Sequence, residues 1–483
     1  MNKQIKPMQS RQLNKANLPV LLLLAGLWII TASAQNKAPG PENNTPFSTI
    51  CLYLDKDHYF QAKKIYEQQK KMLNPTERLL TEAILENAFN KPAVSNKKIG
   101  KLLKMAQRPV PAGLVNAAQN PAREKLIKTV YNSSPEKGHK RTTTPSSGKI
   151  IPDSVLVQLY QLRADNAIKL CDYRGAKEAL EVILNSFPHL LDENQLAETN
   201  NSLTLWKALE NVPKQEIVIR ENSRIRIEKD KIGLSNLKIN NGADTIAFVF
   251  DTGANLSTVA LSTARKLKMT IIPAAIQVGT ITGDKVNASL AYCPGMQLGQ
   301  IQIHNAVFLV MEDSCLSFPQ LDYQIHGILG FPVMEALGEI QITKDDWFIV
   351  PQRQSRFKGR SNLAMNGLTP LICIEGKHFS FDTGADNTIL YQAYYLDNKA
   401  EIEAAYSPVQ VSFGGAGGKK NFEAYVVTDT FNISGRSIVL KDIHLLRERI
   451  KDNENVYGNI GQDLIGQFEK MTINFSRMFV RFD

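Results

Sequence analysis

The sequence predicts an α+β protein of several domains, in which a helical N-terminal region precedes two β-rich lobes. Up to about residue 212, small and apolar residues recur at helical spacing. From residue 215 onward, short alternating apolar runs are separated by glycine and Asn-Gly turns, which is typical of strands. A seven-residue pattern also occurs twice in this second part, which indicates a duplicated domain. The 483 residues suffice for several domains with sizeable cores.

The duplicated pattern places an aspartate at the end of an apolar run. Its copies are residues 248–254 (FVFDTGA) and 379–385 (FSFDTGA), so that Asp251 and Asp382 lie 131 residues apart. Aromatic and β-branched residues favour a strand, and the glycine that follows favours a turn. A single Asp-Thr-Gly is common in ordinary turns. Its duplication favours two acids that are held on matching loops.

Other features recur at the same offset. A Gly-x-x-Gly segment at 327–330 corresponds to one at 458–461, and the run at 340–348 corresponds to 471–479. These matches extend the repeat over two complete lobes.

The Asp-Thr-Gly-Ala motif, followed roughly eighty residues later by Gly-x-Ile/Leu-Gly, resembles the aspartic peptidases. The alanine after each Asp-Thr-Gly is similar to their retroviral branch. The resemblance covers residues 216–483 and implies two pepsin- or retropepsin-like lobes, a first at 213–352 and a second at 353–483.

The resemblance implies that Asp251 and Asp382 are the catalytic pair, with no metal and no cofactor. Two carboxylates about 3 Å apart cannot both ionise, so they share one proton. One carboxylate takes a proton from water while the other donates to the peptide carbonyl. The supporting residues that follow the two acids are Thr252, Gly253, Ala254, Thr383, Gly384 and Ala385.

These supporting residues have separate expected roles. In the family, each threonine bonds across the interface to the other lobe. The glycines allow backbone N–H groups to approach the acids. The alanines carry no hydroxyl that could bond the ionised acid, so we expect an activity optimum at mildly acidic pH.

Two further sets of glycines come from the same resemblance. One set would pack behind the acid-bearing loops: Gly327, Gly330, Gly458 and Gly461. Asn459 departs from the apolar pattern in the last of these segments. The other set, Gly283 and Gly414, marks candidate tips of hairpin flaps, and an ordinary β-turn is an equal alternative for each.

Residues 1–34 have the pattern of a secretory signal peptide. Four cations precede an apolar block at 18–30, and Ala32-Ser33-Ala34 follows. A membrane anchor is the alternative, but the apolar block is short for a membrane span. We therefore expect export to the periplasm, the cell surface or the medium.

The rest of the front half divides into three parts. Residues 35–130 are expected to be helical, 131–150 to form a linker, and 151–212 to form a tetratricopeptide-like helical region. Plain helical packing needs the same small residues and remains an equal alternative.

Charge is concentrated within this front half. The chain has a net charge of +10, and residues 91–141 contain twelve Lys and Arg but only two Glu. This excess could contact an anionic surface, although a solvated face is the more common reason for such a run. Few aromatic residues lie between the cations, so no nucleic-acid partner is expected.

The five cysteines are scattered and odd in number, so neither a disulfide framework nor a metal site is predicted. Cys293 and Cys315 share a lobe, and both a disulfide and two buried thiols remain open for them.

The sequence thus predicts an exported aspartic endopeptidase that acts on a peptide or protein substrate. The alternative is a secreted peptide-binding protein that keeps the fold without turnover. Because one chain supplies both acids, a monomer is expected.

Overall fold

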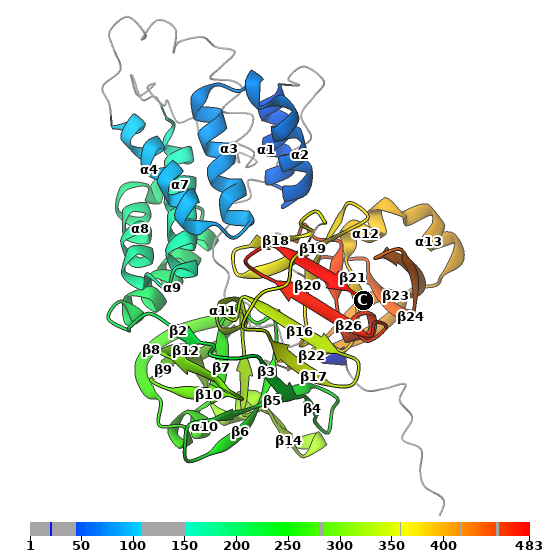
Figure 1. Ribbon diagram of the computed structural model, residues 1–483. Helices are drawn as coiled ribbons and strands as arrows, with labels where there is room; N and C mark the ends of the chain where they lie inside the picture. The colour runs from blue at the N-terminus through cyan, green and yellow to red at the C-terminus, as the bar shows by residue number, and fades with distance from the viewer. Residues whose placement is uncertain are drawn as a thin grey trace, which may run out of the picture.

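The computed structural model describes residues 20–21, 45–107, 151–279, 285–357, 359–415, 418–450 and 454–483. The predicted linker at 131–150, and all of the predicted signal peptide except residues 20–21, lie outside these ranges. Figure 1 shows the helices gathered at one end of the molecule and the β-rich part at the other. Within the described residues, no helix has the length and apolar character needed to cross a membrane.

The helical region packs as successive helices along the chain, and short local signals set their starts. Asn74 and Glu77 form a capping box before one helix, and Asp192 and Gln195 form another before the last. These bonds satisfy N–H groups that would otherwise lack partners. The helices are α1 (Pro46–Leu54), α2 (Tyr59–Gln69), α3 (Pro75–Ala88), α4 (Pro92–Ala106), α7 (Asp153–Lys169), α8 (Tyr173–Ser186) and α9 (Glu193–Leu209).

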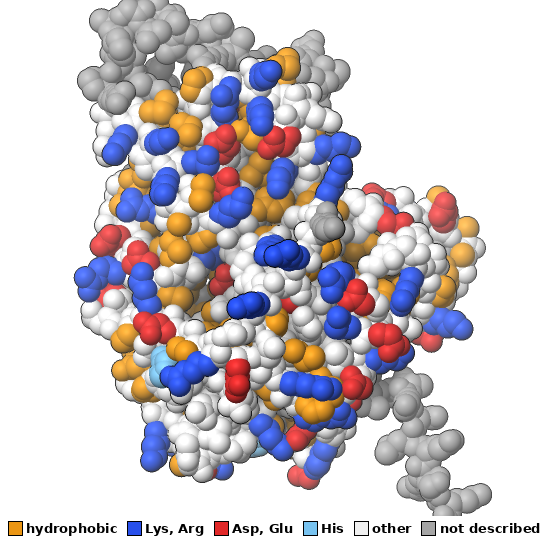
Figure 2. All heavy atoms as spheres, viewed as in Figure 1, with side chains coloured by type: hydrophobic (Ala, Val, Ile, Leu, Met, Phe, Trp, Pro, Cys, Tyr) orange, Lys and Arg blue, Asp and Glu red, His pale blue; other side chains and the backbone are white. Residues whose placement is uncertain are grey.

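The basic run at 91–141 is described only as far as residue 107. Lys97, Lys101 and Lys104 of α4 are exposed. Figure 2 shows Lys and Arg side chains dispersed over the helical region among hydrophobic and acidic side chains. The described part of the run therefore has the character of a solvated helix face.

The first β unit, which we define as residues 216–350, is built on one large sheet. Its described strands run in the order β2-β11-β10-β5-β6-β15-β7-β12-β9-β8, and β4 pairs with β5. The strands are β2 (Glu216–Val218), β4 (Glu228–Lys229), β5 (Ser235–Asn240), β6 (Thr245–Phe250), β7 (Ser257–Ala260), β8 (Thr270–Gly279), β9 (Lys285–Cys293), β10 (Met296–Leu298), β11 (Ile301–His304), β12 (Ala306–Met311) and β15 (Gly327–Leu329). A separate small hairpin joins β13 (Ser317–Phe318) and β14 (Tyr323–Gln324).

The second β unit, residues 363–482, repeats the centre of that sheet. Its order β22-β23-β24-β21-β25-β20-β19 mirrors β8-β9-β12-β7-β15-β6-β5, and the matching pairs are parallel or antiparallel alike. The strands are β18 (Leu363–Asn366), β19 (Thr369–Ile374), β20 (Lys377–Phe381), β21 (Ile389–Leu390), β22 (Val409–Gly415), β23 (Gly418–Ile433), β24 (Arg436–Leu446) and β25 (Gly458–Ile460). At the sheet edge, β1 (Val20–Leu21) pairs with β22.

Short helices follow the same repeat. The helix α10 (Leu261–Lys266) and the helix α12 (Gln392–Asp397) begin 131 residues apart, as do α11 (Phe331–Ala336) and α14 (Gln462–Ile465). Only the second unit adds α13 (Lys399–Ala405) among the described residues.

A third sheet joins the two units. It has the strand order β27-β26-β16-β17-β3, in which β26 (Lys470–Asn474) and β27 (Phe479–Phe482) come from the second unit. The other three strands come from the first unit: β3 (Ser223–Arg226), β16 (Glu339–Thr343) and β17 (Trp347–Val350). We call it the shared sheet. Because β16 pairs with β26, the two units are hydrogen-bonded into one body.

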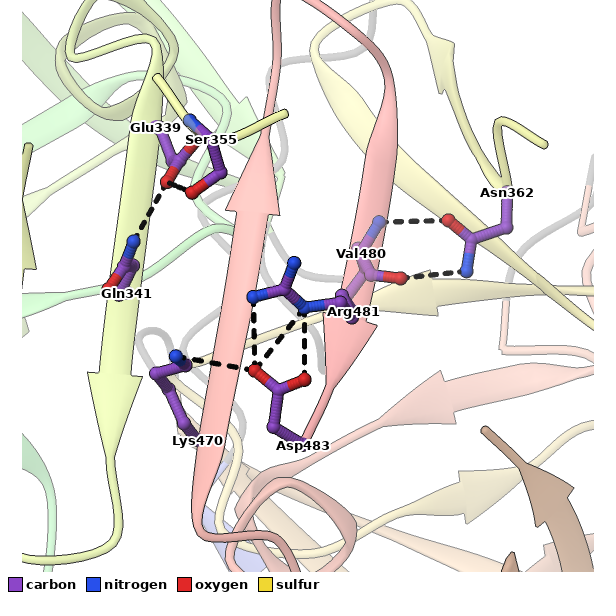
Figure 3. Close-up of polar contacts among 8 residues, drawn as sticks. All are labelled: Glu339, Gln341, Ser355, Asn362, Lys470, Val480, Arg481 and Asp483. Carbon is purple, nitrogen blue, oxygen red and sulfur yellow. Dashed lines mark hydrogen bonds and ion pairs between the residues drawn. The ribbon is translucent and has the colours of Figure 1, made fainter. Parts of the chain in front are cut away.

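Buried Glu339 strengthens the shared sheet at this junction. Its carboxylate accepts hydrogen bonds from the Ser355 N–H at 2.7 Å, from Gln341 at 2.8 Å and from Asn474 at 2.9 Å. Figure 3 shows Glu339 between Ser355 and Gln341, with Asn362 bonded to the backbone of Val480 farther along. Burial alone would raise the pKa of Glu339, but these hydrogen bonds outweigh burial and lower it.

The helical region packs against both β units. Ile50 and Leu54 of α1 share a buried cluster with Ala364 and Leu371 of the second unit. On the other side, the side chain of Asn201 in α9 donates to the backbone oxygen of Gln277 and accepts from its N–H, both at 2.8 Å. The helices therefore hold the two β units from one side, as Figure 1 shows.

All five cysteines are free thiols, including Cys293 and Cys315. Cys293 is buried and Cys315 is partly buried.

Candidate active site

The two Asp-Thr-Gly motifs lie on matching loops at the centre of the molecule. Asp251 follows β6 and Asp382 follows β20 directly. The N–H of Asp251 donates to the oxygen of Leu329 at 2.9 Å, and the N–H of Asp382 donates to the oxygen of Ile460 at 3.0 Å. Each acid is thus held by the neighbouring strand, β15 or β25, which contains the predicted glycine segment.

The two threonines interlock the loops. The Thr252 hydroxyl donates to the Phe381 oxygen at 2.7 Å and accepts from the Thr383 N–H at 3.0 Å. The Thr383 hydroxyl donates to the Phe250 oxygen at 3.2 Å and accepts from the Thr252 N–H at 3.1 Å. All four bonds are buried and relate the two loops by an approximate two-fold symmetry.

This interlock brings the two carboxylates together, and both residues are fully buried. A Cβ atom added to Gly384 would lie 2.4 Å from Cγ of Asp251, which shows how closely the second loop approaches the first acid. Gly253 N–H donates to Asp251 Oδ1 at 2.7 Å. Gly384 and Ala385 N–H groups donate to Asp382 Oδ1 at 2.8 and 3.1 Å.

The pKa values of both acids are raised. Burial raises the pKa of Asp251 well above its usual range, and the charge of Asp382 adds to the effect. Burial also raises the pKa of Asp382, but hydrogen bonds from Asp251, Asn459 and two backbone N–H groups oppose the rise. Apart from the Asp382 carboxyl, Oδ2 of Asp251 has no hydrogen-bond partner among the described residues. A proton shared between the two carboxyls fits this arrangement.

The four glycines predicted to pack behind the loops lie at close approaches. An added Cβ would come within 2.4 Å of the Phe248 ring at Gly327 and within 2.4 Å of the Ile389 oxygen at Gly458. At Gly330 it would lie 2.6 Å from the backbone of Leu256, and at Gly461 2.7 Å from the backbone of Asn387. A side chain at Gly330 or Gly461 would push against the backbone of the loops that follow the acids, whereas at Gly327 and Gly458 it would push against β6 and β21.

Asn459 and Ser380 contribute to the site in a way that the sequence analysis missed. The Asn459 amide donates to Asp382 Oδ2 at 3.1 Å, and its oxygen accepts from the Ser380 hydroxyl at 2.6 Å. Asn459 is fully buried, so its departure from the apolar pattern does not open the packing. The signal was present, because Ser380 and Asn459 are both polar where the first copy has Val249 and Ile328.

The two candidate hairpin tips have different outcomes. Gly283 lies outside the described residues. Gly414 lies within β22, where it pairs with Lys419 of β23, one residue before β22 ends at Gly415. The hairpin thus exists at the second position, but Gly414 is a strand residue.

No group of His, Cys, Asp or Glu that could hold a metal ion occurs in the part of the chain that the structure describes. The site itself consists of two adjacent carboxyls, the Asn459 amide and the backbone N–H groups around them.

Comparison with known proteins gives one match to a family model. Residues 235–333, which include Asp251 and the first glycine segment, match the family described as aspartyl protease. No curated protein sequence matches the chain.

Several solved structures are similar over part of the chain. Basic 7S globulin from soybean is 8% identical with a TM-score of 0.36, over 55% of this chain and 95% of that one. A retropepsin-like aspartic protease from Rickettsia conorii is 17% identical with a TM-score of 0.21, over 28% of this chain and 92% of that one. Conglutin gamma, a basic 7S globulin from lupine seeds, is 7% identical with a TM-score of 0.34, over 54% of this chain and 94% of that one.

Proposed function

We propose that this protein is an exported aspartic endopeptidase whose two β units are the two lobes of one active site. The observation that carries the proposal is the pair of buried carboxyls, Asp251 and Asp382, on interlocked Asp-Thr-Gly loops. The match of residues 235–333 to an aspartyl protease family model supports the same activity.

The reaction uses the two acids without a covalent intermediate. One ionised carboxylate takes a proton from a water molecule, and the water oxygen attacks the peptide carbonyl carbon. The protonated partner donates its proton to the carbonyl oxygen. In the second step, the carboxyl that took the water proton gives it to the departing amine, while the other carboxylate takes a proton from a hydroxyl of the tetrahedral intermediate, which restores the starting state of the pair. The raised pKa values of both acids keep one proton on the pair at mildly acidic pH.

Several features of the protein bear on how it would act. The interlock lies within one chain, which supports an active monomer. The apolar leader at 18–30 supports export. The helices, which contact both units, would orient the lobes, and the cationic run at 91–141 would contact an anionic surface.

The test is cleavage of a mixed peptide library by the purified protein over a series of pH values from strongly acidic to neutral, so that the titration of a carboxyl pair is covered. We expect cleavage that pepstatin inhibits and that Asp251→Asn and Asp382→Asn each abolish. Thr204→Ala, which removes an exposed helix hydroxyl, is the control and should cleave like the wild type.

Three outcomes would contradict parts of the proposal. Cleavage that survives Asp251→Asn would eliminate the dyad. Peptide binding without cleavage at any pH would favour the binding protein. Recovery of activity when the two single variants are mixed would show that the site forms between chains.

A further inference from the structure

We infer that Asp251 holds the proton of the pair and Asp382 is the ionised base, and that Asn459 is the positioning residue that fixes this assignment. The inference rests on the proposed function for its mechanistic meaning. Its structural basis, the different hydrogen bonding of the two acids, can be tested without turnover.

Asp382 is surrounded by donors on both oxygens. Its Oδ1 accepts the N–H groups of Gly384 and Ala385, and its Oδ2 accepts the Asn459 amide. Donors stabilise a carboxylate more than a carboxylic acid, because only the ionised form carries a full charge. Asp382 is thus built to remain ionised although it is buried.

Asp251 lacks the equivalent donor. Its Oδ1 accepts the Gly253 N–H, and the Ala254 N–H also favours its charged form, but apart from the Asp382 carboxyl its Oδ2 has no partner among the described residues. A buried carboxyl oxygen without a donor is costly when ionised, but a proton on this carboxyl removes that cost.

The difference comes from one pair of neighbouring positions. Ser380 and Asn459 face each other across β20 and β25, and the Ser380 hydroxyl holds the Asn459 oxygen so that the amide points at Asp382. The corresponding pair in the first unit is Val249 and Ile328, across β6 and β15. Both of these side chains are buried and apolar, so they donate no hydrogen bond to Asp251.

Other titratable groups around Asp382 do not reverse the assignment. Asp386 and Tyr391, on the segment that follows the second loop, interact electrostatically with Asp382. Burial raises the pKa of both, so each tends to be neutral. Lys229 lies near enough to Asp386 to lower its pKa in part. Of these groups, Asp251 is the acid whose ionisation the charge of Asp382 opposes.

The mechanism then assigns one role to each acid. Asp382 takes the proton from the attacking water, and Asp251 gives its proton to the carbonyl oxygen of the substrate. One proton is taken up and one is released by the pair, so the pair still carries a single proton when the tetrahedral intermediate forms. Asn459 contacts no reacting atom and acts only through Asp382.

The decisive experiment measures each acid alone in the full-length protein. With ¹³C-labelled aspartate carboxyls, Asp382 is titrated in Asp251→Asn and Asp251 in Asp382→Asn, and each signal is assigned by its loss in the double variant. Both variants put an asparagine beside the remaining acid, so this effect cancels. We expect the pKa of Asp382 to be lower than that of Asp251 by about one unit or more. Equal values, or a lower value for Asp251, would overturn the assignment.

Two substitutions test the role of Asn459 in the Asp251→Asn background. Asn459→Leu should raise the pKa of Asp382 by about one unit, because it removes the donor to Oδ2. Ser380→Val should raise it less, because the amide stays but loses its orientation. The matched control is Ile328→Leu in the Asp382→Asn background, which should leave the pKa of Asp251 unchanged. If neither Asn459→Leu nor Ser380→Val moves the pKa of Asp382, Asn459 has no positioning role.

Turnover separates this inference from the proposed function. In a chain with both acids, Asn459→Leu should move the acid limb of the kcat/KM profile upward by about one pH unit. Absence of peptidase activity would defeat the proposed function, while the titrations would still decide the inference. An active enzyme in which Asp251 has the lower pKa would defeat the inference alone.

Discussion

The two β units share one backbone plan but surround their acids differently. Matching strands, loops and short helices recur 131 residues apart, and the threonine bonds across the interface are nearly equivalent. Yet the second unit places a polar pair, Ser380 and Asn459, where the first has an apolar pair. The shared sheet is unequal too, since the first unit supplies three of its strands and the second supplies two.

This difference shows that the position of the acids and their pKa values are set by different parts of the sequence. The repeated backbone brings two identical side chains together, and symmetry alone would give them equal pKa values. Two substitutions behind one acid are enough to make one carboxyl a better base than the other. Duplication thus sets where the acids lie, and later divergence sets what each does.

Among the changes that disturb the fit between the two acid-bearing loops, Gly384→Ala should lower activity most. Its Cβ would fall 2.4 Å from Cγ of Asp251, so the acid must move. We expect kcat/KM to fall by about 100-fold or more, because displacement of a reacting group by about 1 Å costs on this order. Steady-state kinetics on one library peptide would measure it. Gly100→Ala is the control, since its Cβ meets nothing within 4 Å, and a similar loss there would refute the steric argument.

Thr252→Val and Thr383→Val test whether the two threonines contribute equally to the stability of the interlocked loops. Each change leaves one buried N–H and one buried carbonyl without partners. We expect each to lower the free energy of unfolding by about 2 kcal/mol. Urea denaturation would measure the two losses. A loss confined to one variant would show that only one threonine holds the loops together.

Asp251→Asn should stabilise the protein as the pH rises. Because both acids have raised pKa values in the fold, the native pair binds its proton more tightly than the unfolded chain does. Its contribution to stability is complete below the unfolded value of 3.8 and is lost as the pH rises through the native values. The Tm of the variant should therefore exceed that of the wild type by about 2 °C at pH 8. Calorimetry at pH 4 and pH 8 would show a gap that widens with pH, and a constant gap would contradict it.

Ala254→Ser and Ala385→Thr should have the smallest effects on activity, but they compare the surroundings of the two acids most directly. Each adds a hydroxyl beside one acid, which favours the ionised form and lowers the pH optimum from its mildly acidic position. Because Asp382 already has donors on both oxygens, the serine beside Asp251 should shift the optimum more, by about half a unit. Profiles of kcat/KM against pH would compare the two variants. A larger shift from Ala385→Thr would argue against the unequal environments.

The sequence predicts the repeat well because backbone geometry recurs in local patterns. Asp-Thr-Gly ends a strand in both copies, and the change from helical to strand periodicity near residue 215 agrees with the start of β2 at Glu216. What it does not predict is pairing between distant side chains. Asn459 stands out in the sequence only as an irregular residue, because its partner Ser380 lies 79 residues earlier.

The sequence does not predict how the helices dock on the two β units either. The contact of Asn201 with Gln277, and of α1 with β18 and β19, depends on surfaces that form only after folding. Helical periodicity shows that a helix has a buried face, but not which surface covers it. For the site, the sequence does carry a signal: aligning Val249 with Ser380 and Ile328 with Asn459 shows two polar residues where the first copy has two apolar ones.

The shared sheet also sets an order of events during synthesis. Strand β16 ends at Thr343, but its partner β26 begins only at Lys470. While the chain emerges from the ribosome, β16 therefore presents an unpaired edge until the last strands of the second unit are made. Contacts of such long sequence separation form slowly, since a large loop must close first. The two acids therefore meet only after nearly all of the described chain has been translated, so a nascent chain carries no assembled site.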